Sequence, residues 1–136
     1  MRYFIDTNVL INLIEDDYIS KDVEEITDNY ENSIYISSEC IREYILLIQS
    51  GKIIGKKNKK EIDIFDLVEN TLNITIKYIA KEHLKTYAML ETVEDHADPF
   101  DRLIIAHAIT EKIPLISSDK KFPKYRKQGL EFIPNY

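Results

Sequence analysis

The chain has 136 residues and a formal net charge of −6, with 44% hydrophobic and 31% charged residues. This composition excludes a disordered chain and a fibrous repeat, and the length suits one domain, residues 1–136. No apolar run approaches the roughly 20 residues of a membrane span, and Asp6 comes too early for a signal peptide. The single cysteine, Cys40, excludes an internal disulfide and a zinc site of several cysteines, so we expect a cytoplasmic protein.

Charged residues are unevenly distributed along the chain. A net charge of −6 argues, taken alone, against a nucleic-acid partner. Ten of the eighteen basic residues nevertheless fall in two short runs. Each run is either a solvated loop or helix end, or an edge that faces phosphate groups, and net charge does not decide between them. The runs consist of Lys52, Lys56, Lys57, Lys59 and Lys60, and of Lys120, Lys121, Lys124, Arg126 and Lys127.

Short apolar segments alternate with amphipathic ones, which predicts strands alternating with helices. Ser20 and Asp98 stand where a helix cap is expected, and Asn58 with Glu61 has the spacing of a capping box. The alternation predicts an α/β fold with a mostly parallel central sheet and helices on both faces. The predicted elements are a strand over 3–5, a helix over 9–14, a helix after Ser20, a strand over 33–37, a helix over 38–49 ended by Gly51, a helix from 58 to about 72, a strand over 73–79, helices over 80–91 and 98–111, and strands over 115–117 and 130–133.

Four acidic residues fall where such a fold places its ligand site. Ligands of an open α/β sheet bind beyond the carboxyl ends of the strands, where Asp6 follows the first strand and Asp119 the fourth. Asp101 in a first helical turn and Glu43 in the helix after the second strand can point to the same end. Converging carboxylates repel one another, and a hard dication such as Mg²⁺ or Mn²⁺ would resolve that conflict.

Each acid also has an ordinary structural interpretation. Asp6 can end a strand and cap the next helix, and Asp98 with Asp101 has the pattern of an N-cap and an acidic third position. Glu43 can be a solvated helix residue, and Asp119 a turn residue. No single position decides between structure and function.

Four motifs stand in order along the chain: FIDTNVLI over 4–11, ISSECIREYI over 36–45, HADPFDRLIIA over 96–106 and LISSDKKF over 115–122. Together they resemble the motifs of the PIN-domain ribonucleases, in particular the VapC toxins of type II toxin–antitoxin pairs. The resemblance covers essentially the whole chain. It implies a PIN-like three-layer sandwich and a metal-dependent endoribonuclease that hydrolyses RNA phosphodiester bonds.

The resemblance also implies roles for individual residues. Asp6 and Asp101 would be the main ligands of Mg²⁺ or Mn²⁺, Glu43 would bind metal or orient the attacking water, and Asp119 would complete the site. Around these catalytic acids it implies supporting roles for Asn8, Ser117 and Asp98, and a phosphate or carboxylate contact for Arg102.

The same resemblance implies partners. These are an RNA substrate, a small antitoxin whose tail covers the acidic site, and a second copy of the chain in a homodimer. We expect an exposed apolar groove between the N-terminal helices, including Val9, Leu13 and Ile14, to receive the antitoxin. Two alternatives stay open: a PIN-type nuclease of general RNA processing outside any toxin pair, and a catalytically silent module that keeps the fold.

The three histidines are not expected to form a metal site. His83, His96 and His107 are scattered along the chain, and we interpret them as surface or packed residues. Two positions depart from the family pattern: Arg42 stands where an aromatic residue is frequent, and His107 where a small or neutral polar residue is usual. Neither departure affects the four acids.

Overall fold

Strands and helices alternate along the chain, as the sequence predicts. The computed structural model describes residues 1–53, 63–94 and 96–136. The predicted capping box of Asn58 and Glu61 and the lysines at 56, 57, 59 and 60 lie outside the described residues. The elements are β1 (Arg2–Ile5), α1 (Thr7–Ile14), α2 (Lys21–Asp28), β2 (Ser33–Ser37), α3 (Ser38–Gln49), α4 (Asp63–Asp66), the π-helix η1 (Leu67–Thr71), β3 (Thr75–Lys77), α5 (Lys81–Met89), α6 (Pro99–Glu111), β4 (Leu115–Ser117), the 3₁₀-helix η2 (Phe122–Gln128) and β5 (Phe132–Pro134).

The five strands form one parallel sheet in the order β3-β2-β1-β4-β5. The central strand β1 pairs with β2 on one side and with β4 on the other, where Ile5 lies opposite Ile116. The chain builds outward from β1 to β3 and then crosses to the other side for β4 and β5. This reversal opens a crevice at the carboxyl ends of β1 and β4, where α/β sheets bind their ligands.

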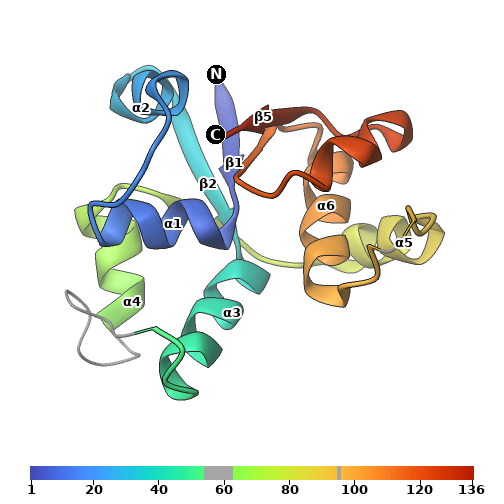
Figure 1. Ribbon diagram of the computed structural model, residues 1–136, viewed down its shortest axis with the longest axis horizontal. Helices are drawn as coiled ribbons and strands as arrows, with labels where there is room; N and C mark the ends of the chain where they lie inside the picture. The colour runs from blue at the N-terminus through green and yellow to red at the C-terminus, as the bar shows by residue number, and fades with distance from the viewer. Residues whose placement is uncertain (54–62, 95) are drawn as a thin grey trace.

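Helices lie on both sides of the sheet, with α1 and α4 to the left of the strands and α5 and α6 to the right in Figure 1. The core between them is aliphatic and aromatic, and Phe4, Ile5 and Leu115 are almost fully buried in it. Strands enclosed on both faces need continuous apolar runs, which is why β1 and β4 are short apolar segments. No helix in the described part of the chain is long and apolar enough to cross a membrane.

Two predicted caps are confirmed. The Ser20 hydroxyl accepts a hydrogen bond from the backbone N–H of Val23 at 3.3 Å, and the Asp98 carboxylate accepts one from the N–H of Phe100 at 2.9 Å. These caps start α2 and α6 because each satisfies a backbone donor that has no partner within the helix.

Several elements differ from the prediction. The described part of the helix predicted up to about residue 72 consists of α4 and the π-helix η1, and α5 ends at Met89 instead of residue 91. β3 is shorter than the predicted strand over 73–79, and Asn73 at the predicted start has a positive φ of 56°, outside the range of regular strands. β5 begins two residues later than predicted, after Gly129 closes η2 with a φ of 106°. The 3₁₀-helix η2 itself was not predicted. Its side chains Phe122 and Tyr125 are buried, so tertiary packing, more than helical periodicity, holds it in place.

We predicted that Val9, Leu13 and Ile14 line an exposed apolar groove, and this is wrong for two of the three. Val9 is 0% exposed and Ile14 is 1% exposed, and both belong to the core. Only Leu13 is partly exposed. The N-terminal helix therefore turns these side chains toward the sheet, and they offer no surface to a partner.

Candidate active site

Asp6 lies at the carboxyl end of β1 and caps α1. One carboxylate oxygen accepts a hydrogen bond from the backbone N–H of Thr7 at 2.7 Å, and the other accepts one from the Ser117 hydroxyl at 2.7 Å. The Asp6 backbone N–H donates to the backbone carbonyl of Ile116 at 2.9 Å, which connects the residue to β4. Asp6 is 4% exposed. The structural interpretation of Asp6 as a cap is thus correct, and it leaves the carboxylate facing the crevice.

A polar frame joins the ends of β1 and β4. The Asn8 side-chain amide lies 3.3 Å from both the Asp6 carboxylate and the Ser117 hydroxyl, and its oxygen accepts from the N–H of Ser118 at 3.2 Å. The Ser117 hydroxyl also accepts from the N–H of Asp119 at 3.1 Å. Asn8 and Ser117 therefore connect Asp6 and Asp119 through hydrogen bonds.

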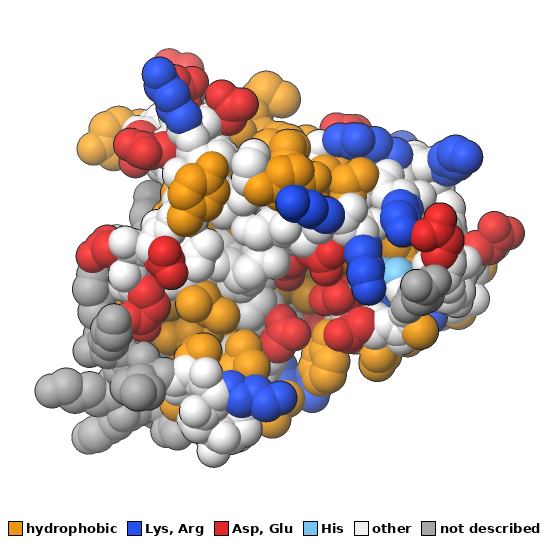
Figure 2. All heavy atoms as spheres, viewed as in Figure 1, with side chains coloured by type: hydrophobic (Ala, Val, Ile, Leu, Met, Phe, Trp, Pro, Cys, Tyr) orange, Lys and Arg blue, Asp and Glu red, His pale blue; other side chains and the backbone are white. Residues whose placement is uncertain are grey.

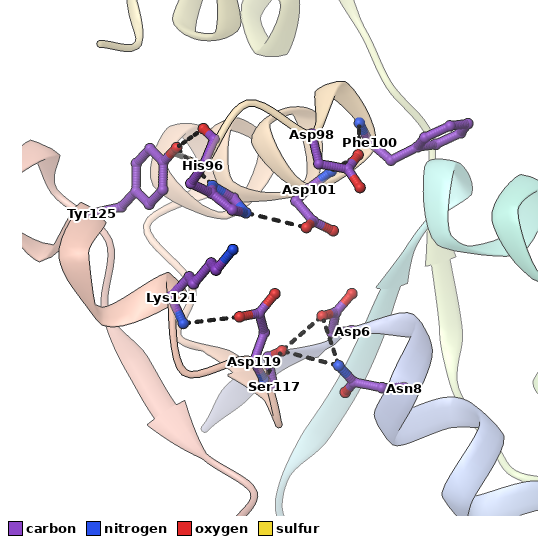
Figure 3. A network of polar contacts seen from close by, with 10 residues as sticks. All are labelled: Asp6, Asn8, His96, Asp98, Phe100, Asp101, Ser117, Asp119, Lys121 and Tyr125. Atoms are coloured by element: carbon purple, nitrogen blue, oxygen red, sulfur yellow. Dashed lines mark hydrogen bonds and ion pairs between the residues drawn. The ribbon is translucent and has the colours of Figure 1, made fainter. Parts of the chain in front are cut away.

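The four predicted acids meet in one pocket of about 200 Å³ at the crevice. Figure 3 shows the carboxylates of Asp6, Asp101 and Asp119 directed toward one another from the residue before α1, from α6 and from the turn after β4. In Figure 2 acidic side chains gather in a hollow near the centre of the face, with basic side chains around it. The pocket is lined by Asp6, Thr7, Asn8, Ile11, Glu43, Leu47, Asp101 and Asp119.

Burial and mutual repulsion shift the acidity of two of these groups. Burial, and then the nearby Asp101 and Glu43 carboxylates, raise the pKa of Asp6 from 3.8 to about 7, against the lowering effect of its hydrogen bonds. Burial and the neighbouring carboxylates, Asp98 and Asp119 foremost, also raise the pKa of Asp101 from 3.8 to about 7. The pocket is therefore poor in positive charge for the number of carboxylates it holds, and a bound dication would relieve both shifts.

His96 lies beside this pocket, in contact with Asp101, and sequence reasoning missed that contact. Its Nε2 lies 3.1 Å from Oδ2 of Asp101, and its Nδ1 lies 2.8 Å from the Tyr125 hydroxyl. Burial lowers the pKa of His96 below its usual 6.5. The available signal was its position, five residues before Asp101 and just ahead of the cap that starts α6.

Two of the predicted supporting residues have clear structural partners. Asp98 is exposed and caps α6, accepting from the N–H of Phe100. The Arg102 guanidinium donates to the Leu90 carbonyl at 2.7 Å and lies over the Tyr87 ring at 5.3 Å. Arg102 is thus directed at the end of α5, and the predicted carboxylate contact is not among the interactions of the described residues.

Two charges of the second basic run have other partners. Lys124 pairs with Glu94 at 2.5 Å, and Arg126 donates to a backbone carbonyl of β5 at 3.3 Å. The backbone N–H of Lys121 donates to Asp119 at 2.8 Å, and Figure 3 shows its side chain extending toward His96 and Asp101. Lys121 is the member of this run best placed to meet a bound phosphate.

The donor atoms in the pocket fit a divalent metal ion. One ligand atom each from His96, Asp101 and Asp119 lie within 4.8 Å of one another. Asp6 and Glu43 lie outside this tight group of described residues but line the same pocket. Carboxylate oxygens suit Mg²⁺ and Mn²⁺, and the elevated pKa values of Asp6 and Asp101 indicate a site short of a cation.

The other two histidines are packed residues, as predicted, although they are neighbours in the fold despite their separation along the chain. The rings of His83 and His107 lie 4.0 Å apart between α5 and α6, beside Glu111. The Ala80 N–H donates to Nδ1 of His83, so Nε2 carries the proton and donates it to Glu111 at 2.7 Å. A neutral His83 ring thus has no lone pair left for a metal, and the cluster is a buried hydrogen-bonded network.

The fold and the pocket define an α/β protein with an acidic site at the switch point of a parallel sheet. The chain belongs to the PIN domain family, whose sequence model matches residues 3–128. PIN domains are nuclease-type hydrolases that use a divalent metal ion. Sequence comparison with curated proteins finds no match.

Solved structures support the same fold. VapBC2 from Rickettsia felis bound to a DNA fragment from its promoter matches with a TM-score of 0.70 and 22% identity over 98% of both chains. DNA-bound VapBC from Salmonella typhimurium matches with a TM-score of 0.69 and 16% identity over 100% of this chain and 99% of the other. A toxin–antitoxin complex from Klebsiella pneumoniae matches with a TM-score of 0.65 and 17% identity over 98% of both chains. These likenesses establish the PIN fold along the full length of the chain.

Proposed function

We propose that this protein is a metal-dependent endoribonuclease and the toxin of a VapBC-type toxin–antitoxin pair. The observation that carries the proposal is the meeting of Asp6, Glu43, Asp101 and Asp119 in one pocket at the crevice. A catalytically silent module has no need of such a repulsive cluster, which burdens folding. Membership of a nuclease family supports a catalytic role for these acids.

Each acid has a distinct part in this proposal. Asp6, Asp101 and Asp119 would hold Mg²⁺ or Mn²⁺, and Glu43 would bind metal or orient the attacking water. The bound ion would lower the pKa of that water and offset the negative charge that develops at phosphorus. Asn8 keeps the Asp6 carboxylate in a single orientation by hydrogen bonding. Fixed charges of this kind need no rearrangement during the reaction.

A cleavage assay tests the nuclease. Purified protein is incubated with a mixed RNA substrate and Mg²⁺ or Mn²⁺, then with EDTA, and the variants Asp6→Asn and Asp101→Asn are compared with Asp22→Asn. Asp22 is an exposed acid of α2 and serves as the matched control. We expect EDTA and the two pocket variants to reduce cleavage at least about 100-fold, since each removes a metal ligand. Cleavage that persists in both pocket variants would exclude this site.

The toxin assignment adds an antitoxin, and a homodimer, as proposed partners. Its support is that similar structures are those of VapBC proteins and of a toxin–antitoxin complex. Expression of the chain alone should arrest growth, and co-expression of a short neighbouring open reading frame should restore it. Active nuclease without growth arrest would favour the alternative of general RNA processing. Light scattering of the purified chain would measure whether it forms the expected dimer.

A further inference from the structure

A buried histidine faces the acidic pocket with its ring held in one orientation. His96 is 5% exposed and lies in the segment between α5 and α6. Its ring packs edge-on against Phe122 and Tyr125, with ring centroids 5.9 Å and 5.3 Å away. Figure 3 shows the ring between Tyr125 and Asp101, with Nε2 directed at the carboxylate. Packing therefore holds this nitrogen against the Asp101 carboxylate.

Tyr125 contacts both the backbone carbonyl and the ring of His96. Its hydroxyl donates to the backbone carbonyl of His96 at 3.2 Å and lies 2.8 Å from Nδ1 of the same residue. A carbonyl oxygen only accepts, and tyrosine has a single hydroxyl proton. Both contacts are hydrogen bonds only if Nδ1 donates to the tyrosine oxygen. The neutral ring then presents the lone pair of Nε2 to Asp101.

The lone pair of Nε2 and an ionised Asp101 are both acceptors, so at 3.1 Å they need a proton or a metal cation between them. Asp119 adds a third ligand atom, and all three atoms lie within 4.8 Å of one another. Metal–ligand bonds of about 2.1 Å at right angles place neighbouring ligand atoms about 3 Å apart. The separation of His96 and Asp101 therefore suits two ligands of one ion.

We propose that Nε2 of His96 is a nitrogen ligand of the metal ion that Asp101 and Asp119 hold, and that it makes the site prefer Mn²⁺ over Mg²⁺. The inference rests on the proposed metal-dependent function. Mg²⁺ takes oxygen ligands and holds its waters tightly, whereas imidazole nitrogen suits the first-row transition metals. The Tyr125 hydroxyl is the outer hydrogen-bond partner that such a histidine ligand requires.

Pulsed EPR of bound Mn²⁺ tests the ligand directly, without any activity measurement. The wild-type protein should show hyperfine coupling from a directly bound nitrogen-14. His96→Gln should lose this coupling and weaken Mn²⁺ binding about 10-fold or more, with a smaller change in Mg²⁺ binding. Tyr125→Phe keeps the ring packing and should weaken Mn²⁺ binding by a smaller factor. His107→Gln, which alters a buried histidine outside the pocket, should keep the wild-type signal.

The outcomes separate this inference from the proposed function. Mn²⁺ bound to the wild-type protein without nitrogen coupling overturns the His96 assignment, even if His96→Gln fails to fold. RNA cleavage that still depends on Asp101 would then leave the nuclease intact. Equal losses of Mn²⁺ and Mg²⁺ affinity in His96→Gln overturn the metal preference. Nitrogen-coupled Mn²⁺ in a protein that cleaves no RNA overturns the nuclease and supports the ligand.

Discussion

The replacement Asp6→Asn should abolish activity and yet make the metal-free protein less sensitive to rising pH. Burial, with Asp101 and Glu43 nearby, raises the pKa of Asp6 to about 7 in the folded protein, from 3.8 for the free group. The folded state therefore binds a proton that the unfolded state releases. This contribution to stability is fully present at low pH and is lost as the pH rises through about 7.

The size of the effect follows from the two pKa values. One pKa unit corresponds to about 1.4 kcal/mol, so Asp6 removes roughly 2–3 kcal/mol of unfolding free energy between pH 5 and pH 8. The side chain is almost fully buried, so solvent screens little of this effect. An asparagine has no charge to bury and should lack this slope, while its amide oxygen can still accept the Thr7 hydrogen bond.

Urea unfolding in EDTA at pH 5 and pH 8 measures the difference. Between these pH values the free energy of unfolding of the wild-type protein and of the control Asp22→Asn should fall by roughly 2–3 kcal/mol more than that of Asp6→Asn. Saturating Mn²⁺ at pH 8 should restore stability to the wild type and restore much less to Asp6→Asn, because the ion supplies the missing positive charge. If the free energy of unfolding of the wild type and of Asp6→Asn fell equally with rising pH, burial of the Asp6 charge would not be the cause of the loss.

Three further predictions concern individual side chains. His107 should show the opposite pH dependence, because burial, with His83 nearby, lowers its pKa from 6.5 to about 4. As the pH falls from 7 to 5, the neutral His107 should lower the free energy of unfolding by roughly 2 kcal/mol. Urea unfolding of His107→Gln should not show this loss. Ser117→Ala should cut the cleavage rate about 10-fold and destabilise the fold by about 1 kcal/mol, since Asp6 and Asp119 lose a shared partner. Ser20→Ala should lower the thermal midpoint through a loss of about 1 kcal/mol at the α2 cap and leave cleavage unchanged.

Local sequence patterns predict much of this fold. The apolar runs of β1 and β4, the Asp98–Pro99 start of α6 and the Ser20 cap each depend on residues within one turn or one strand. Local signals also place Asp6 and Asp119 after neighbouring parallel strands, because parallel strands end at the same edge of the sheet. The sequence by itself thus determined the fold class and the neighbourhood of these two acids.

Only the tertiary structure decided which side chains face one another. Periodicity identifies an apolar helix face, but packing alone buries Val9 and Ile14 in the core. The approach of His83 to His107 depends on how α5 lies against α6, which the spacing along the chain does not express. The contact of His96 with Asp101 depends on Tyr125, 29 residues away along the chain, whose hydroxyl lies 2.8 Å from Nδ1 of the histidine. Contacts between distant segments carry no local signal, so they become visible only when the chain is folded.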